Sequence, residues 1–214
     1  MNFAQICFKI CEITGVIAFS ISGTMVAIDK KTDLFGVLFI SVITGFGGGM
    51  MRDICLGDLP PRVFSSVPEV LICMAAAVAV FIVAAILKSR FIDNEERIEN
   101  IINVLDAIGL GAFAVTGVRI ALDSAKGGTF LVLTMGLITA VGGGLIRDLI
   151  LREIPFVLKK RIYALAAIFG SAAYLVLTRL NINEGIAMAG GVASTFLVRL
   201  MATRFRWKLP KAIK

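Results

Sequence analysis

The chain of 214 residues contains no histidine, and its four cysteines (Cys7, Cys11, Cys55 and Cys73) form no CxxC motif. Histidines and closely spaced cysteines are the usual ligands of zinc in proteins, so we expect no metal site and no thiol redox pair. The chain also lacks a serine nucleophile motif, and no catalytic residues can be named from it. An enzyme is therefore the least favoured class, and we expect no cofactor.

Charged residues are scarce as well, at 17% of the chain, whereas 58% of the residues are apolar and the mean hydropathy is +0.92. A soluble helical protein needs helices with a polar outer face, and the segment Val70–Leu87 has none. The first apolar segment lacks a basic leader and carries Glu12, which argues against a secretory signal peptide. We therefore predict an all-α integral membrane protein.

Seven apolar runs approach or exceed the length that crosses about 30 Å of hydrocarbon at 1.5 Å per residue. The predicted spans are Ile10–Ile28, Leu34–Leu56, Pro68–Leu87, Ile101–Leu122, Thr129–Leu151, Ile162–Leu177 and Ile186–Met201. We interpret residues 1–214 as one transmembrane domain. It comprises repeat 1 (8–88), a polar linker (88–100), repeat 2 (101–178), a seventh helix (185–203) and a basic tail (204–214).

The two repeats are marked by a doubled motif. Gly47, Gly48 and Gly49 precede Arg52 and Asp53, and the same pattern returns 95 residues later as Gly142, Gly143, Gly144, Arg147 and Asp148. Upstream, Glu12 aligns with Asp106 at a shift of 94 residues. Because each repeat holds three spans, an odd number, the second repeat must be inverted relative to the first. Paired, glycine-interrupted apolar segments of this kind are typical of membrane transport proteins.

Three adjacent glycines remove every side chain for about one helical turn, and each weakens a helix by roughly 1 kcal/mol relative to alanine. We therefore expect the second and fifth helices to bend or unwind there, next to a cavity where freed carbonyl groups are not exposed to lipid. The alternative is that the glycines only let two helices approach closely.

Charges within or at the ends of apolar membrane segments usually face a cavity or each other. Seven ionisable residues have such positions: Glu12, Arg52, Asp53, Asp106, Arg119, Arg147 and Asp148. Arg52 and Asp53 are sequence neighbours whose side chains should point about 100° apart on a helix, so we do not expect them to pair directly. Glu12 with Arg52, and Asp106 with Arg147, are the expected pairs, because both recur in the two repeats. A purely structural role for these pairs remains the alternative.

The basic residues predict the orientation. A cytoplasmic C-terminus places fourteen basic residues inside and four outside, which is the asymmetry of the positive-inside rule. The inside set is Lys30, Lys31, Lys88, Arg90, Arg97, Arg152, Lys159, Lys160, Arg161, Arg204, Arg206, Lys208, Lys211 and Lys214, and the outside set is Lys9, Arg62, Lys126 and Arg179. The net charge of +7 thus reflects topology and anionic headgroups, and no nucleic-acid partner is expected.

The whole pattern resembles the prokaryotic branch of the trimeric intracellular cation (TRIC) channels, over roughly residues 5 to 203. The resemblance lies in the seven spans, the inverted repeats and the Gly-Gly-Gly-x-x-Arg-Asp motif in spans 2 and 5. It implies a homotrimer in the prokaryotic plasma membrane with one pore per protomer, permeable to K⁺ and other monovalent cations such as Na⁺. It also implies that the two glycine triplets form the pore kinks and that Arg52, Asp53, Arg147 and Asp148 line or brace the pore. The basic motif with which eukaryotic members bind phosphoinositides is absent, which leaves a generic bound lipid.

Two functions remain open on these residues. Passive cation flow needs only aligned carbonyl and hydroxyl oxygens. A secondary transporter of a small amino acid such as glycine, a label also given to such bacterial proteins, would instead use Arg52 or Arg147 to hold a carboxylate.

Overall fold

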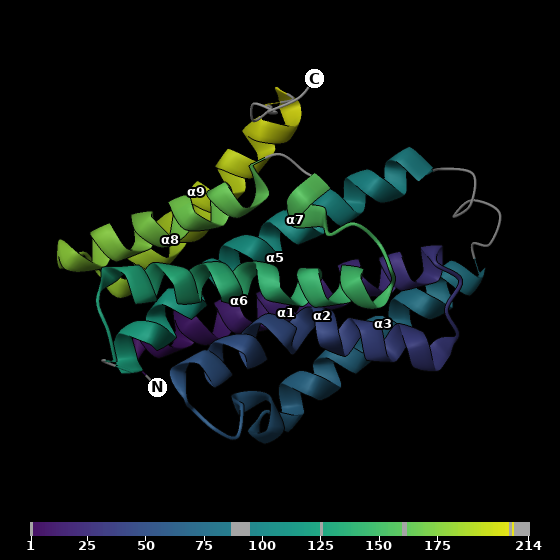
Figure 1. The fold of residues 1–214 in the computed structure, drawn as a ribbon, viewed down its shortest axis with the longest axis horizontal. Coiled ribbons are helices and arrows are strands. Elements are labelled where there is room, and N and C mark those ends of the chain that lie inside the picture. Colours follow the sequence, from purple (N-terminus) through teal and green to yellow (C-terminus); the bar gives the residue numbers. More distant parts are fainter. Residues whose placement is uncertain (1, 87–94, 125, 160–161, 206, 208–214) are drawn as a thin grey trace.

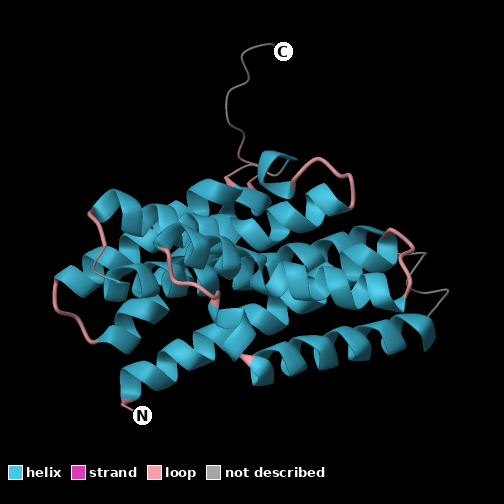
Figure 2. Cartoon of the chain, turned by 60° about the horizontal axis from the view of Figure 1, so that its bottom comes forward, coloured by secondary structure: helices cyan, strands magenta, loops and turns pink. Residues whose placement is uncertain are grey.

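The computed structural model describes residues 2–86, 95–124, 126–159, 162–205 and 207, and all regular structure in these ranges is helical (Figures 1 and 2). The elements are α1 (Phe3–Asp29), α2 (Leu34–Leu56), η1 (Arg62–Ser65), α3 (Val67–Ile86), α5 (Glu95–Ser124), α6 (Thr129–Ile150), α7 (Phe156–Lys159), α8 (Tyr163–Arg179) and α9 (Glu184–Arg204). Most of the expected linker 88–100 and most of the expected basic tail lie outside the described residues.

Each predicted span corresponds to one helix. Six of these helices, α1, α2, α3, α5, α6 and α9, are long and apolar enough to cross a membrane. The remaining span, α8, is an apolar helix of 17 residues. At 1.5 Å per residue it extends about 25 Å, slightly less than the hydrocarbon thickness.

Local sequence explains where several helices begin and end. The Asn2 side chain accepts a hydrogen bond from the Gln5 amide, and the Gln5 side chain accepts one from the Asn2 amide, which forms a capping box at the start of α1. Asp33 caps α2 through the Gly36 amide at 2.7 Å. At the other end of α2, Gly57 adopts a left-handed conformation (φ 70°) that ends the helix.

The two repeats pack against each other in opposite directions. In the α1–α5 contact, Gly15 lies against Phe113 and Gly109 lies against Phe19, so ascending numbers in one helix meet descending numbers in the other. The two phenylalanine rings meet edge to face with centroids 5.2 Å apart. The glycines make room for these rings, and the antiparallel pairing agrees with the inverted repeat that the sequence predicts.

The glycine triplets form the second contact between the repeats, where α6 lies against α2 near the middle of the molecule (Figure 1). A Cβ atom on Gly48 would overlap the Thr139 carbonyl oxygen, and one on Gly143 would overlap the Thr44 carbonyl oxygen. Both helices run without interruption through their triplets. The expected unwinding does not occur, because the carbonyl groups there keep their helical partners. The first role of the glycines is therefore close helix packing.

Candidate functional site

Each Arg-Asp pair of the doubled motif forms a local unit at the end of its helix. In site 1, centred on Arg52 and Asp53, the arginine Nη2 and Nε donate to Asp53 Oδ1 at 2.7 and 2.9 Å. In site 2, centred on Arg147 and Asp148, the arginine Nε donates to Asp148 Oδ1 at 2.8 Å. The expectation that sequence neighbours would not pair was wrong. The arginine side chain is long enough to bridge the angle between the two positions.

The second carboxylate oxygen of each aspartate holds a short helix in place. Asp53 Oδ2 accepts a hydrogen bond from the amide of Arg62, the first residue of η1, at 2.9 Å. Asp148 Oδ2 accepts one from the amide of Phe156, the first residue of α7, at 2.6 Å. Amides at a helix start have no partner within the helix and favour a negative charge. The aspartates thus fix the connection from the second helix of each repeat to the third.

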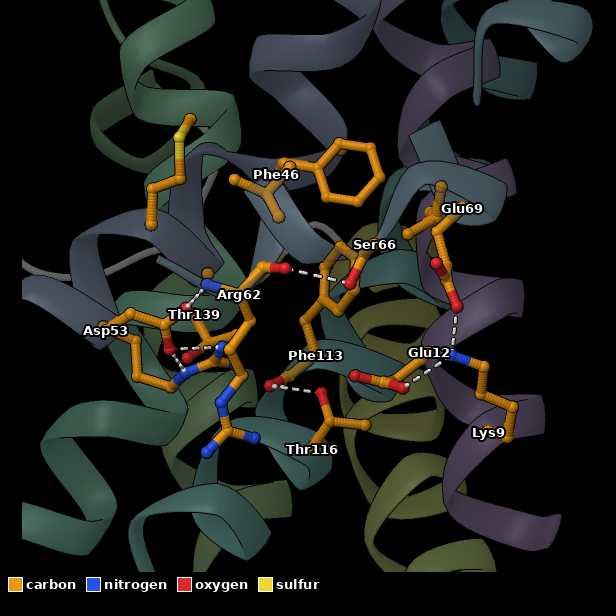
Figure 3. Close-up of a pocket in the computed structure, with 16 residues that line it drawn as sticks. Lys9, Glu12, Phe46, Asp53, Arg62, Ser66, Glu69, Phe113, Thr116 and Thr139 are labelled. Carbon is orange, nitrogen blue, oxygen red and sulfur yellow. Dashed lines mark hydrogen bonds and ion pairs between the residues drawn. The ribbon is translucent and has the colours of Figure 1, made fainter. Parts of the chain in front are cut away.

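Site 1 opens into a cavity with a volume of about 70 Å³ (Figure 3). On one side, Lys9 of α1 forms ion pairs with Glu12, at 3.5 Å, and with Glu69 of α3. Asp53 and Arg62 lie on the other side. The cavity is therefore lined by charges of both signs, contributed by α1, α2, α3 and η1.

The inner part of this cavity reaches the helix contact. Gly45 and Gly49 of α2 line it together with the hydroxyl-bearing Thr116 and Thr139. Thr139 Oγ1 donates to the Met135 carbonyl at 2.6 Å, which leaves the hydroxyl oxygen free to accept or to coordinate. A Cβ atom on Gly49 would make only an ordinary van der Waals contact, 3.6 Å from Arg52 Nη2, so no other segment packs closely against this position. The third glycine of the triplet thus borders the cavity, whereas the second forms the contact.

Site 2 is sealed by a buried polar network. Asp106 Oδ1 accepts a hydrogen bond from the Ser22 hydroxyl at 2.6 Å, and its Oδ2 accepts one from the Tyr163 hydroxyl at 3.0 Å. Arg147 Nη1 lies 3.6 Å from Asp106 Oδ1 and 3.3 Å from the Ser22 hydroxyl. Asp106 and Arg147 are both 1% exposed. The expected pair of Asp106 with Arg147 is confirmed, and both residues are buried.

The equivalent pair in repeat 1 was predicted wrongly. Arg52 pairs with Asp53, and Glu12 pairs with Lys9 instead of Arg52, although both Glu12 and Arg52 line the site 1 cavity. A nearer cation, one helical turn away on α1, takes the carboxylate. Among the described residues, no group of three histidine, cysteine, aspartate or glutamate side chains could hold a metal ion.

Sequence reasoning missed four residues that complete the two sites: Lys9, Glu69, Tyr163 and Arg199. Arg199 of α9 lies over the Tyr163 ring, 4.8 Å from its centroid, and so adds the seventh helix to site 2. Glu69 and Tyr163 occupy corresponding places near the start of the third helix of each repeat. The spacing of the repeats relates these two positions, but one is a glutamate and the other a tyrosine, so a search for identical residues in the two repeats did not find them.

Comparison with known proteins agrees with this architecture. The family model described as "Glycine transporter" matches the chain twice, over residues 9–85 and 103–179. The two matched segments are the two structural repeats, so the duplication is a property of the family. The first match contains site 1 and the second contains Asp106, Arg147 and Tyr163.

Curated relatives cover nearly the whole chain. The UPF0126 inner membrane protein YadS of Escherichia coli K12 is 35% identical over 201 residues, which are 93% of each chain. The UPF0126 membrane protein YvgT of Bacillus subtilis is 32% identical over 212 residues, or 95% of each chain.

Solved structures match equally well. The TRIC trimeric intracellular cation channel orthologue of Rhodobacter sphaeroides is 34% identical with a TM-score of 0.83, and the match covers 94% of this chain and 98% of that one. A prokaryotic TRIC channel in 0.5 M KCl is 32% identical with a TM-score of 0.85, covering 96% and 100% of the two chains.

These matches, with the six long apolar helices and the duplicated motif, identify the chain as a non-enzymatic integral membrane protein. It belongs to the glycine transporter (UPF0126) family and shares the fold of the prokaryotic TRIC channels.

Proposed function

We propose that this protein is a monovalent cation channel, with K⁺ as its principal ion and one pore per protomer. The observation that carries the proposal is the site 1 cavity, which leads from acidic side chains to threonine hydroxyls at the α2–α6 contact. Hydroxyl and carbonyl oxygens are the groups that replace water around a permeating cation. The similarity to TRIC channel structures at 32–34% identity supports the same activity.

The two arginines of the doubled motif are compatible with cation flow because each is paired with a carboxylate. Asp53 pairs with Arg52, and both Asp106 and Asp148 contact Arg147. Glu12 and Glu69 also line the cavity with the Lys9 ammonium group between them, and Arg62 on the opposite side pairs with Asp58. The Glu12 and Glu69 carboxylates are the groups of the wall that can attract a cation.

We propose that the described conformation is the closed pore, with the site 2 network lying across the ion path beyond the glycine contact. We propose that conduction requires α2 and α6 to bend at Gly47–Gly49 and Gly142–Gly144. Such a bend would separate the two triplets and draw Arg147 away from Asp106. Glycines in the middle of a helix lower the resistance to bending.

We further propose a homotrimer in the plasma membrane, with site 1 facing outward and site 2 facing the cytoplasm. Native mass measurement in detergent should give three copies, and only monomers or dimers would contradict the assembly. A C-terminal reporter should be active in the cytoplasm, and activity confined to the outside would overturn the orientation.

Single-channel recording in a planar bilayer tests the central proposal. Purified protein should conduct with KCl alone on both sides and no amino acid present. Gly49→Leu should abolish conductance because the side chain enters the cavity. Gly128→Leu is the matched control, because nothing lies within 4 Å of a Cβ at Gly128. Folded wild-type protein without K⁺ conductance would refute the channel.

A transporter of glycine is the second candidate, and the family description favours it. The cavity also presents both arginine and glutamate side chains, which suit the carboxylate and ammonium groups of a zwitterion. Uptake of labelled glycine into liposomes, saturable and abolished by Arg52→Gln, would support this function if K⁺ conductance is absent.

A further inference from the structure

A second cavity lies between α5 and α9 and has a volume of about 250 Å³. It borders site 2 through Arg199, which lines it. We propose that it is a binding site for an anionic phospholipid, with the phosphate at Arg199 and an acyl chain along the groove. The site is built mainly by the seventh helix, which belongs to neither repeat, so site 1 has no equivalent of it.

The first argument is the state of Arg199. This side chain is only 2% exposed, lines the cavity, and its Nε has no hydrogen-bond partner among the described residues. The Tyr163 ring and the nearby Asp106 carboxylate stabilise the charge, but neither accepts a hydrogen bond from Nε. A buried arginine normally satisfies its donors with a carboxylate or a phosphate, because an unpaired buried charge is strongly destabilising. The missing partner is therefore an anion that enters from the cavity.

The second argument is the order of polar and apolar residues along the groove. Asn100 lies toward the start of α5 and Arg204 at the end of α9, the ends that we place at the membrane surface, whereas Val104 and Phe196 lie further along the two helices from these ends. Arg204 is five residues from Arg199, which corresponds to about 7.5 Å along a helix. A polar mouth above an apolar groove matches the headgroup and acyl chain of a lipid. A free inorganic anion would make no use of the apolar part.

The third argument is position. Arg204, at the mouth of the cavity, is in the last turn of α9, at the same end of the molecule as the start of α5. Arginines near the end of a membrane helix lie at headgroup depth, where anionic lipid phosphates are concentrated. The lipid would thus enter sideways from the leaflet at this end and reach Arg199 without crossing the protein.

Native mass spectrometry of the intact protein in detergent tests the proposal without measuring transport. The probes are dioleoyl phosphatidylglycerol, dioleoyl phosphatidylcholine and inorganic phosphate alone. Wild-type protein should retain phosphatidylglycerol about tenfold better than phosphatidylcholine, because the charged contact favours the anionic lipid. Inorganic phosphate should bind no more than to the control variant. Arg199→Gln should lose the preference.

Three further variants keep the test decisive. Ala107→Phe fills the groove without changing a charge and should also reduce retention of phosphatidylglycerol about tenfold, whereas Arg204→Gln should weaken it less. Arg152→Gln, an exposed position at the same end of the molecule, should leave it unchanged. Equal retention of the two lipids, or a preference that survives in both Arg199→Gln and Ala107→Phe, would overturn the proposal. Binding of inorganic phosphate as strong as that of the lipid would overturn it as well. If Arg199→Gln does not fold, Ala107→Phe decides.

Discussion

Sites 1 and 2 begin from the same motif and end in opposite environments. In each, an arginine pairs with the next aspartate, and that aspartate holds the first amide of a short helix. The carboxylate supplied by the first helix of each repeat differs in its surroundings. Asp106 is enclosed by Ser22, Tyr163 and Arg147, whereas Glu12 faces a cavity and pairs with Lys9. The comparison shows that a duplicated motif fixes the local unit and that its neighbours decide whether the unit is open or sealed.

The third helix of each repeat explains why site 1 is open and site 2 is closed. Tyr163 of α8 donates a hydrogen bond directly to Asp106 and closes site 2. Its counterpart region in α3 carries Glu69, which repels Glu12 and reaches it only through the Lys9 ammonium group. At site 2 the neutral Tyr163 hydroxyl donates directly to Asp106, and the network is closed. At site 1 the two carboxylates, Glu12 and Glu69, need the Lys9 cation between them, and a cavity remains beside them.

Replacing the two arginines should give the largest difference between the sites. Arg147→Gln leaves Asp106 and Asp148 buried together without their common cation, and we expect a loss of about 3–5 kcal/mol of stability. Arg52→Gln leaves Asp53 beside a cavity that water can enter, and we expect about 1.5–3 kcal/mol. Thermal unfolding in detergent measures both variants. Equal losses would show that site 1 is as dry as site 2.

The glycine triplets offer a comparison within one motif. Gly48→Ala and Gly143→Ala each place a methyl group against a backbone carbonyl oxygen that cannot move alone, and each should lose about 3 kcal/mol. Gly49→Ala and Gly144→Ala are the matched controls, since their Cβ atoms would meet only ordinary contacts, and they should unfold within a few degrees of wild type. Stable Gly48→Ala protein would contradict the close helix contact.

Tyr163→Phe should weaken the closed network of site 2 with a smaller loss of stability than the preceding substitutions. It removes the hydrogen bond to Asp106 and keeps the ring under Arg199, so we expect a loss of about 1 kcal/mol. If site 2 is the gate, the variant should also open more often in bilayer recordings. Lys9→Met is the counterpart at site 1, and it should raise conductance at low K⁺ by freeing two carboxylates. An unchanged open probability in Tyr163→Phe would mean that this network is purely structural.

The loops give the smallest expected effect and show the same symmetry. Lys126 donates to Asp58 at 2.8 Å, and Lys30 donates to Glu153 at 2.7 Å, so each repeat holds the loop of the other. The hydrogen bond from Lys126 lowers the pKa of Asp58, whereas the hydrogen bond that Lys30 donates to Glu153 raises the pKa of Lys30.

The sign of the pH effect follows from these directions. The contribution of Asp58 is complete above an unfolded pKa of about 3.9 and is lost as the pH falls through its lower folded pKa. The contribution of Lys30 is complete below about pH 10.4 and is lost as the pH rises through its higher folded pKa. Lys126→Gln and Lys30→Gln should each lower the unfolding temperature slightly at pH 7, and less so in high salt. An effect that does not depend on salt would argue against these ion pairs.

Several features could be predicted from the sequence because they depend on local composition. The positions of the spans follow from apolar run length, and the repeats follow from the spacing of the glycine and Arg-Asp motifs. The pairing of Asp106 with Arg147 was predicted from the recurrence of these charges in both repeats, although the same reasoning failed for Glu12 with Arg52. The short helices η1 and α7 were not anticipated, because four residues carry too little periodicity to mark a helix.

The sequence by itself determined a membrane protein made of two related halves, because hydrophobic length and repetition are properties of the chain read in order. Only the tertiary structure decided what the glycines and charges do. The glycine triplets form a helix–helix contact because α2 and α6 cross at these positions. Where two segments distant in sequence cross is a property of the folded chain. Glu12 pairs with Lys9, and Arg52 pairs with Asp53, because these are the opposite charges that the fold places nearest to them.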